Sequence, residues 1–138
     1  MRSDVSRKGD KMIVKTLKAL GWVTGFALIG LGVGRIFFPS ETMPGAGEMS
    51  ATMDSETRAA GALLIAMGAG YLWAVRQTEI PVAAVRFLAA SMGLLALTRV
   101  VSIVAVGMPD PVFAAAAGVE FAAAALTWWY SCLGARRR

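Results

Sequence analysis

The segment from Arg99 to Glu120, RVVSIVAVGMPDPVFAAAAGVE, places one basic and one acidic residue in two apolar stretches separated by a tight turn. Arg99 lies eight residues before Gly107, and Glu120 lies nine residues after Pro111. Two antiparallel helices that rise ~1.5 Å per residue would hold both charges roughly 12–14 Å from the turn. The spacing therefore predicts a buried Arg99–Glu120 ion pair between two membrane helices.

The composition of the whole chain indicates a membrane protein. Of 138 residues, 57% are hydrophobic and only 17% are charged, whereas soluble domains carry about 25% charged residues. The net charge of +5 is concentrated at the two ends and in one short middle segment. This distribution lacks the continuous basic face of a nucleic-acid-binding protein, so we expect no nucleic-acid partner.

Histidine and cysteine, two residue types that often carry catalysis or bind metals, are nearly missing. The sequence has no histidine and only one cysteine, Cys132, which excludes an internal disulfide and a cysteine-cluster metal site. Ser91, Ser102 and Ser131 have no histidine to activate them. We expect no catalytic residue, no metal and no cofactor, and therefore no enzymatic activity.

Four apolar stretches are long enough to be membrane helices, at about residues 19–38, 57–75, 82–106 and 112–133. Twenty helical residues span ~30 Å, the thickness of a hydrocarbon core. The first stretch exceeds the length of a signal-peptide core and no small-residue cleavage site follows it, so we expect it to be retained. The prediction is an all-α polytopic membrane protein, with a four-transmembrane-helix bundle over residues 19–133.

Basic segments flank this bundle, an interfacial segment at residues 1–18 and a short tail at residues 134–138. Six Lys or Arg residues lie in the first segment, and arginines also flank the turn between the second and third helices. The connections at 39–56 and 107–111 carry acidic residues and no Lys or Arg. By the positive-inside rule we expect both termini to be cytoplasmic and these two connections to lie outside.

Glycine spacing predicts close helix packing in the first two helices. Six glycines at four-residue or seven-residue spacings form the expected packing faces: Gly21, Gly25, Gly30, Gly34, Gly61 and Gly68. Gly21 and Gly25 share one face of the first helix, and Gly30 and Gly34 lie nearly opposite them. The sequence leaves two alternatives for these faces, which are GxxxG-type packing within the bundle and packing between chains.

Six polar residues fall in the half of the bundle that we expect to be outward: Arg35, Glu56, Arg58, Arg99, Ser102 and Glu120. Charged residues at membrane depth cost about 3 kcal/mol each on insertion and need partners. One interpretation is a basic ligand-binding pocket in which Glu120 neutralises one arginine and the surplus charge binds a carboxylate, a phosphate or a lipid headgroup. The alternatives are a structural ion-pair network that sets helix register, or an ion pathway.

Short motifs in the same segments resemble those of a known family. They are GRIFFP at 34–39, ETR at 56–58, Arg99 with Ser102, GMP at 107–109, and Glu120. The chain is similar, over most of its length, to small bacterial membrane proteins described as domain of unknown function 4345. The basic N-terminal segment and the three arginines at 136–138 look like additions of this member. The resemblance implies four transmembrane helices in a bacterial plasma membrane and no assigned reaction.

From these observations we expect a small integral membrane protein that is an accessory or structural subunit of a larger membrane complex. Its partners would be membrane lipids and either other membrane proteins or a second copy of itself. The alternative is a binder or carrier of a lipid or small anion through the Arg/Glu cluster.

Overall fold

Four long helices make up most of the structure. The computed structural model describes the backbone of residues 2–136 and the side chains of residues 9–136. Two parts of the predicted basic segments lie outside the described residues. They are residues 137 and 138 of the tail and the side chains of residues 1–8. The helices are α1 (Arg2–Phe37), α2 (Ala51–Arg76), α3 (Val82–Val106) and α4 (Pro111–Ala135). The predicted all-α class with four helices is confirmed.

Each of the four helices is long and apolar enough to cross a membrane. The two shortest candidate spans contain 25 residues each, which is ~37 Å of helix against a hydrocarbon core of ~30 Å. Large apolar side chains such as Val23, Phe87 and Val104 point away from the rest of the molecule. An outer surface of this kind suits lipid rather than water, and the chain is a multi-pass membrane protein.

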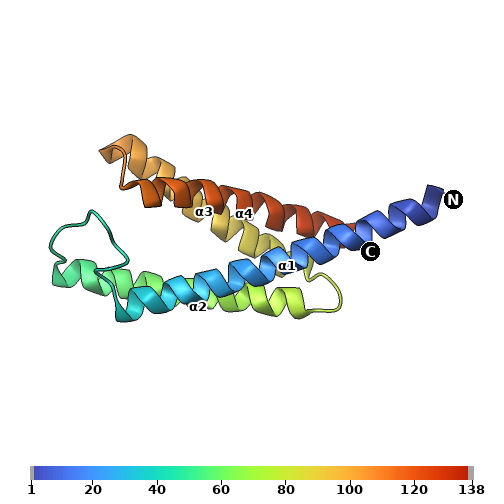
Figure 1. Cartoon of the computed structure of the whole chain (residues 1–138), viewed down its shortest axis with the longest axis horizontal. Helices are drawn as coiled ribbons and strands as arrows, with labels where there is room; N and C mark the ends of the chain where they lie inside the picture. The colour runs from blue at the N-terminus through green and yellow to red at the C-terminus, as the bar shows by residue number, and fades with distance from the viewer. Residues whose placement is uncertain (1, 137–138) are drawn as a thin grey trace.

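The helices form two antiparallel hairpins, α1–α2 and α3–α4 (Figure 1). The helices of each hairpin contact each other along their lengths, whereas contacts between the hairpins are sparse. The hairpins lie close together at the end with the 77–81 connection, which we name the narrow end. They spread apart at the end with the 38–50 and 107–110 connections, which we name the wide end (Figure 1).

The start of α2 differs from the prediction. α2 begins at Ala51, six residues before the start predicted at about residue 57, and Ser50 caps it. The Ser50 hydroxyl accepts a hydrogen bond from the backbone N–H of Met53 at 3.2 Å. This bond satisfies one of the free N–H groups of the first turn, so the helix begins within the polar segment predicted as a connection.

The limits of α3 and α4 lie closer to those predicted from hydropathy, whereas α1 begins at Arg2 rather than at about residue 19. α3 covers residues 82–106 as predicted, and α4 is one residue longer at its start and two residues longer at its end than 112–133. α1 is a single helix that includes most of the basic segment at 1–18. Its first turns project beyond the other helices at the narrow end (Figure 1).

Glycines bring the backbones of α1 and α2 into contact. A Cβ atom added to Gly25 would lie 3.0 Å from the carbonyl oxygen of Gly68, and one added to Gly68 would lie 2.6 Å from that of Gly25. Nearer the wide end, Gly32 and Gly61 meet in the same way, at 2.5 Å and 2.7 Å. Neither pair leaves room for a side chain. The equal spacing of seven residues on both helices therefore sets the antiparallel register of the hairpin.

The remaining predicted packing glycines have different surroundings. Gly21 faces the Val75 side chain on α2, which a Cβ atom at Gly21 would approach to 2.4 Å. An added Cβ would meet no atom within 4 Å at Gly30 and only Thr42, at 3.4 Å, at Gly34. The second packing face predicted for the first helix is therefore not covered by another described helix, because α1 packs closely against α2 alone.

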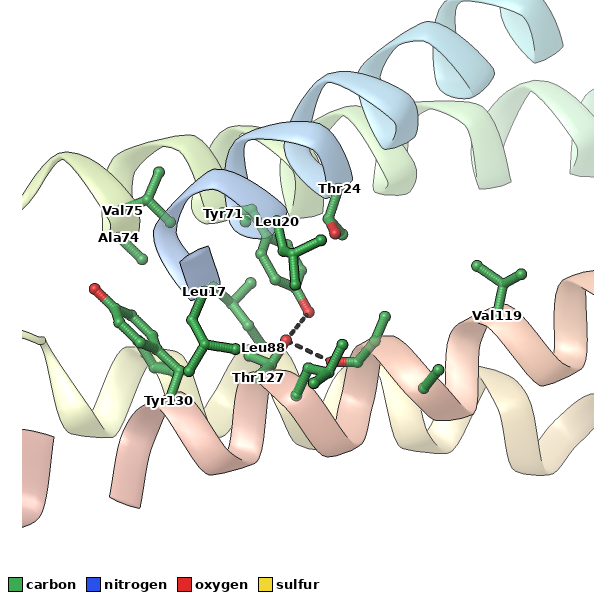
Figure 2. Close-up of a pocket in the computed structure, with 15 residues that line it drawn as sticks. Leu17, Leu20, Thr24, Tyr71, Ala74, Val75, Leu88, Val119, Thr127 and Tyr130 are labelled. Carbon is green, nitrogen blue, oxygen red and sulfur yellow. Dashed lines mark hydrogen bonds between the residues drawn. The ribbon is translucent and has the colours of Figure 1, made fainter. Parts of the chain in front are cut away.

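A mainly apolar core joins the two hairpins at the narrow end (Figure 2). The hydroxyl of Tyr71 on α2 lies 2.9 Å from the hydroxyl of Thr127 on α4, beside a cavity of 190 Å³. Thr127 also donates to the Ala123 carbonyl at 2.6 Å. Lys18 on α1 donates to the backbone carbonyl of Gln77 at 2.9 Å. These contacts hold the narrow end together, whereas the charged residues of the predicted pocket lie at the wide end.

Candidate functional site

Arg99 on α3 and Glu120 on α4 form a bidentate ion pair. Arg99 Nε donates to Glu120 Oε2 at 2.7 Å, and Arg99 Nη2 donates to Glu120 Oε1 at 2.8 Å. Their side chains are only 20% and 12% exposed. The Phe113 ring adds a cation–π contact, with its centroid 5.8 Å from the guanidinium carbon of Arg99. The ion pair predicted from the spacing around the turn is present, in the geometry that gives the strongest charge-assisted hydrogen bonds.

The turn between α3 and α4 places these two residues opposite each other. Gly107 adopts a φ of 106°, a conformation that residues with a side chain rarely adopt. The Asp110 carboxylate accepts a hydrogen bond from the Val112 N–H at 3.0 Å, and Pro111 is the first residue of α4. An acidic cap followed by proline is a strong signal for a helix start. The turn therefore fixes the position at which α4 begins.

Arg35, in the last turn of α1, is the third charged residue of the site. It lines one cavity together with Arg99 and Glu120. Its Nε atom is buried and has no hydrogen-bond partner within the part of the chain that the structure describes. Both carboxylate oxygens of Glu120 are already bound by Arg99. The three residues, which we name the Arg35 cluster, therefore carry one positive charge in excess.

Two cavities meet at this cluster, between the hairpins at the wide end. The first, which we name the connection-side cavity, has a volume of 480 Å³ and includes Met43 and Pro109 of the two connections in its wall. The second, which we name the interhairpin groove, has a volume of 360 Å³ and includes Met67 on α2 and Leu94 on α3. Four residues line both cavities: Arg35, Leu95, Thr98 and Arg99.

Two hydroxyl groups lie beside the arginines. Ser102, a predicted site residue, is exposed and lines the connection-side cavity. Thr98 was not predicted, although it lines both cavities, and its hydroxyl donates to the Leu95 carbonyl at 2.7 Å. Its only signal in the sequence is its place next to Arg99, and adjacent helical residues point about 100° apart. The Met43–Ala46 part of the wall was also missed, because periodicity does not predict the path of a connection.

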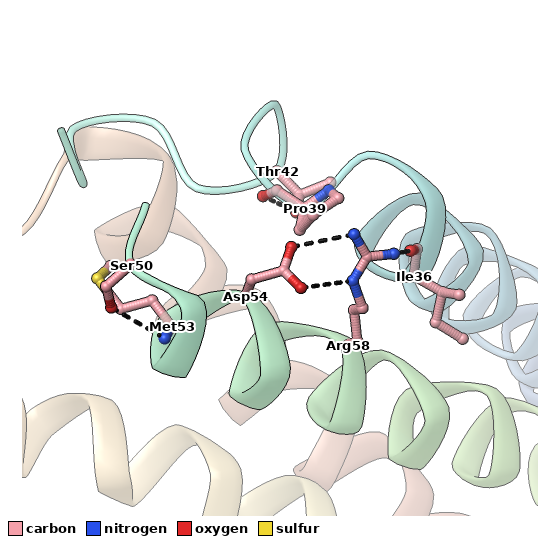
Figure 3. Close-up of polar contacts among 7 residues, drawn as sticks. All are labelled: Ile36, Pro39, Thr42, Ser50, Met53, Asp54 and Arg58. Atoms are coloured by element: carbon pink, nitrogen blue, oxygen red, sulfur yellow. Dashed lines mark hydrogen bonds and ion pairs between the residues drawn. The ribbon is translucent and has the colours of Figure 1, made fainter. Parts of the chain in front are cut away.

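Arg58 and Glu56 lie outside the Arg35 cluster. Arg58 is exposed and forms a bidentate pair with Asp54 at 2.8 Å and 3.0 Å, and it also donates to the Ile36 carbonyl at the end of α1 (Figure 3). Glu56 is exposed and lines neither cavity. The structure does not bring these two residues into the predicted pocket. The reason is the early start of α2, which places Asp54 one turn before Arg58 on the same face.

The site offers guanidinium chemistry rather than metal ligation. Among the described residues, no three Cys, Asp or Glu side chains gather closely enough to hold a metal ion. Cys132 is a half-buried free thiol near the end of α4. The groups at the Arg35 cluster that remain available are hydrogen-bond donors of positive charge, which suit an oxyanion.

One known protein family matches most of the chain. The family model described as "Domain of unknown function (DUF4345)" matches residues 16–131. The chain belongs to this family. The resemblance noted from the short motifs is confirmed, and the DUF4345 match includes all three residues of the Arg35 cluster. Neither a curated protein nor a solved structure matches the chain.

Proposed function

We propose that this DUF4345 protein is a non-enzymatic membrane protein that binds an anionic group, a carboxylate or a phosphate-type oxyanion, at Arg35 and Arg99. The observation that carries the proposal is the buried Nε of Arg35, which has no acceptor within the described residues although Arg35 lines two cavities. Buried donors in proteins are almost always hydrogen-bonded. A guanidinium group presents a planar fork of donors that matches the oxygens of such an anion.

The charge balance within the Arg35 cluster supports an anionic ligand. Arg35 and Arg99 carry two positive charges against the single negative charge of Glu120. The Asp110 carboxylate, which caps α4, adds a negative charge to the connection-side cavity, so the excess positive charge lies on the side of the interhairpin groove, whose charged residues are those of the Arg35 cluster. An uncompensated charge at membrane depth costs about 3 kcal/mol on insertion. A bound anion would compensate the charge that Glu120 leaves unpaired.

A purely structural ion-pair network explains Arg99 but not Arg35. Such a network is favourable only if each buried member has a partner, since a partly satisfied network is less stable than an apolar core. Arg99 and Glu120 satisfy each other, whereas the Nε of Arg35 lacks an acceptor within the described residues. This difference between the two arginines favours a ligand that is held by Arg35.

The test compares two variants, Arg35→Gln and Arg58→Gln, in a non-ionic detergent. Arg58 is the matched control because it is exposed and lines neither cavity. Butyl phosphate is titrated into each protein, and the affinity is measured by calorimetry. We expect Arg35→Gln to lower the affinity about tenfold or more, since hydrogen bonds to charged groups contribute about 1.5–3 kcal/mol. Equal affinity of Arg35→Gln and the parent protein would refute the proposal.

A second candidate function is an accessory or structural subunit of a larger membrane complex. The observation in its favour is the uncovered side of α1 around Gly30, where a neighbouring helix has room to approach closely. The partner would be another membrane protein or a second copy of this chain. The measurement is native mass spectrometry after extraction from native membranes in a mild detergent. A free monomer without any protein partner would contradict this candidate.

We propose in addition that both termini are cytoplasmic in a bacterial plasma membrane. The support is the distribution of Lys and Arg, six of which lie within residues 1–18 while none lies within the 38–50 and 107–110 connections. The positive-inside rule places the segments that are rich in Lys and Arg in the cytoplasm. Labelling of single cysteines at Glu48 and Ala135 in a Cys132→Ser background checks the orientation. We expect a membrane-impermeant reagent to label Glu48→Cys in intact cells and Ala135→Cys only after lysis.

A further inference from the structure

We infer that the anion bound at Arg35 is the headgroup of a membrane amphiphile, and that the acyl chain of this amphiphile lies in the interhairpin groove. This inference rests on the proposed function, because the headgroup is the anion that Arg35 and Arg99 bind. It adds the class of ligand and the route by which the ligand reaches the site, which is sideways from the bilayer.

The lining of the groove suits a hydrocarbon chain. Apart from the Arg35 cluster, most of its wall is aliphatic: Leu28, Leu31, Leu63, Leu64, Met67 and Leu94. On α1 the lining runs from Leu28 to Arg35, seven residues or ~10 Å of helix. About eight carbons of an extended chain cover this length at ~1.3 Å per carbon. The groove is therefore long enough for the upper part of an acyl chain.

The side of the groove is open. Leu63 on α2 and Leu94 on α3 both line it, yet they are 72% and 64% exposed. The two hairpins that carry them spread apart towards the wide end (Figure 1). In a bilayer, such an apolar opening between two membrane helices is in contact with lipid rather than water. An acyl chain can therefore enter from the bilayer without leaving an apolar environment.

The headgroup site and the groove are continuous. Arg35 and Arg99 belong to both cavities, together with Leu95 and Thr98. A headgroup at these arginines would have the connection-side cavity on one side and the aliphatic groove on the other. A small soluble anion would contact only the arginines and their polar neighbours and would make no contact with the aliphatic wall. The pairing of excess positive charge with an apolar groove fits a molecule that has an anionic head and a hydrocarbon chain.

The size and charge of the groove favour an amphiphile over a helix of another protein. A helix with its side chains is ~10–12 Å in diameter and contacts its neighbours over several turns. The groove is only about two turns long and ends at a positive charge in excess. A flexible chain with one anionic end satisfies both properties, since the chain fills the aliphatic wall and the head compensates the charge.

The experiment uses inorganic phosphate, butyl phosphate and dodecyl phosphate as probes, with the full-length protein in one non-ionic detergent. Leu94→Trp fills the groove with a larger side chain at an exposed position, so the core is not disturbed. Leu97→Trp is the matched control, because Leu97 is exposed on the same helix and lines neither cavity. Dodecyl phosphate partitions into micelles equally for all variants, and its partition coefficient, measured without protein, is used to correct its affinity before the comparison with butyl phosphate.

We expect the parent protein and Leu97→Trp to bind dodecyl phosphate roughly tenfold or more tightly than butyl phosphate. Leu94→Trp should remove this preference and keep the affinity for butyl phosphate. The inference is overturned if butyl and dodecyl phosphate bind the parent equally, which would indicate a soluble anion as the ligand. It is also overturned if Leu94→Trp keeps the preference for dodecyl phosphate, which would mean that the acyl chain lies outside the groove.

The same titrations separate this inference from the proposed function. If the affinity for butyl phosphate depends on Arg35 but chain length has no effect, the anion site stands and only the acyl-chain site fails. If Arg35→Gln binds every probe as tightly as the parent, the anion site fails and the acyl-chain site fails with it. If the dependence on Arg35 and the dependence on chain length are both present and Leu94→Trp removes only the second, both proposals are supported.

Discussion

At the scale of single residues, the Glu120 carboxylate decides whether Arg99 is tolerated at its depth. Glu120→Gln leaves the Arg99 guanidinium largely buried without a charged partner. Removing one member of a buried pair costs about 3–5 kcal/mol, so we expect the free energy of unfolding to fall by about 3 kcal/mol. Unfolding by denaturing detergent, followed by circular dichroism, measures the change. Glu56→Gln, at an exposed position on α2, is the control and should change the stability little.

The double variant Arg99→Met with Glu120→Leu completes this test. Replacing both members of a buried ion pair by apolar residues of similar size is often neutral or stabilising. We expect the double variant to recover most of the stability lost in Glu120→Gln. A Glu120→Gln protein as stable as its parent would mean that the ion pair does not stabilise the hairpin.

The charged residues also show what the sequence reveals about the site. Arg99 and Glu120 are predictable because each lies at a similar distance from one short turn, so that helix geometry alone brings them together. Arg35 is predictable as a charge close to the end of an apolar helix. The ion pair of Arg58 is not predictable, because its partner Asp54 lies in a polar stretch that hydropathy assigns to a connection. The cavities depend on how the two hairpins meet, which no local pattern encodes.

At the scale of helices, the glycine contacts make the α1–α2 hairpin sensitive to one methyl group. In Gly68→Ala the new Cβ would lie 2.6 Å from the backbone carbonyl oxygen of Gly25, which cannot rotate away. We expect a loss of about 1–3 kcal/mol in the free energy of unfolding, the usual effect of overpacking. The control Gly30→Ala adds a methyl group where no atom lies within 4 Å.

Gly30→Ala should be neutral or should stabilise α1 by up to about 1 kcal/mol, because alanine has the higher helix propensity. The same detergent-unfolding measurement serves for both variants. Equal effects of Gly68→Ala and Gly30→Ala would contradict the hairpin register. A large loss in Gly30→Ala alone would instead show that the uncovered side of α1 is a packing surface.

Helix limits were predictable wherever hydropathy and capping agree. At α3 the apolar stretch begins after Pro81 and ends before Gly107, and both limits were predicted to the residue. At α2 the first turns are polar, and the cap at Ser50 overrides the hydropathy pattern. At α1 the basic segment continues the helix, because it contains no proline that would end the helix. Membrane helices can therefore extend well past their apolar spans.

At the scale of the whole molecule, the arrangement of the hairpins could not be predicted from the sequence. In a soluble helix the apolar stripe identifies the buried face, but in a membrane helix the lipid-facing side is apolar too. The pattern therefore gives little information about which helices are neighbours or how far apart they lie. Small residues indicate neighbouring helices better, as the glycine pairs between α1 and α2 show.

The sparse contact between the hairpins predicts that the two ends of the molecule differ in mobility. The narrow end is held by the Tyr71–Thr127 hydrogen bond and the apolar core, whereas the wide end contains the two cavities at the Arg35 cluster. Elements with few buried contacts open more easily than densely packed ones. We therefore expect the distance between α2 and α3 to vary more at the wide end than the distance between α2 and α4 at the narrow end.

Pulsed electron paramagnetic resonance measures this difference in a Cys132→Ser background. One pair of spin labels, at Ser55 and Ala105, reports on the wide end, and a second pair, at Arg76 and Ala135, reports on the narrow end; all four positions are exposed. We expect a broad distance distribution for the first pair and a narrow one for the second. Dodecyl phosphate should narrow the first distribution and leave the second unchanged, because a ligand that bridges both hairpins restricts only the end that it occupies. Equally narrow distributions without ligand would mean that the cavities are rigid and that the hairpins move as one body.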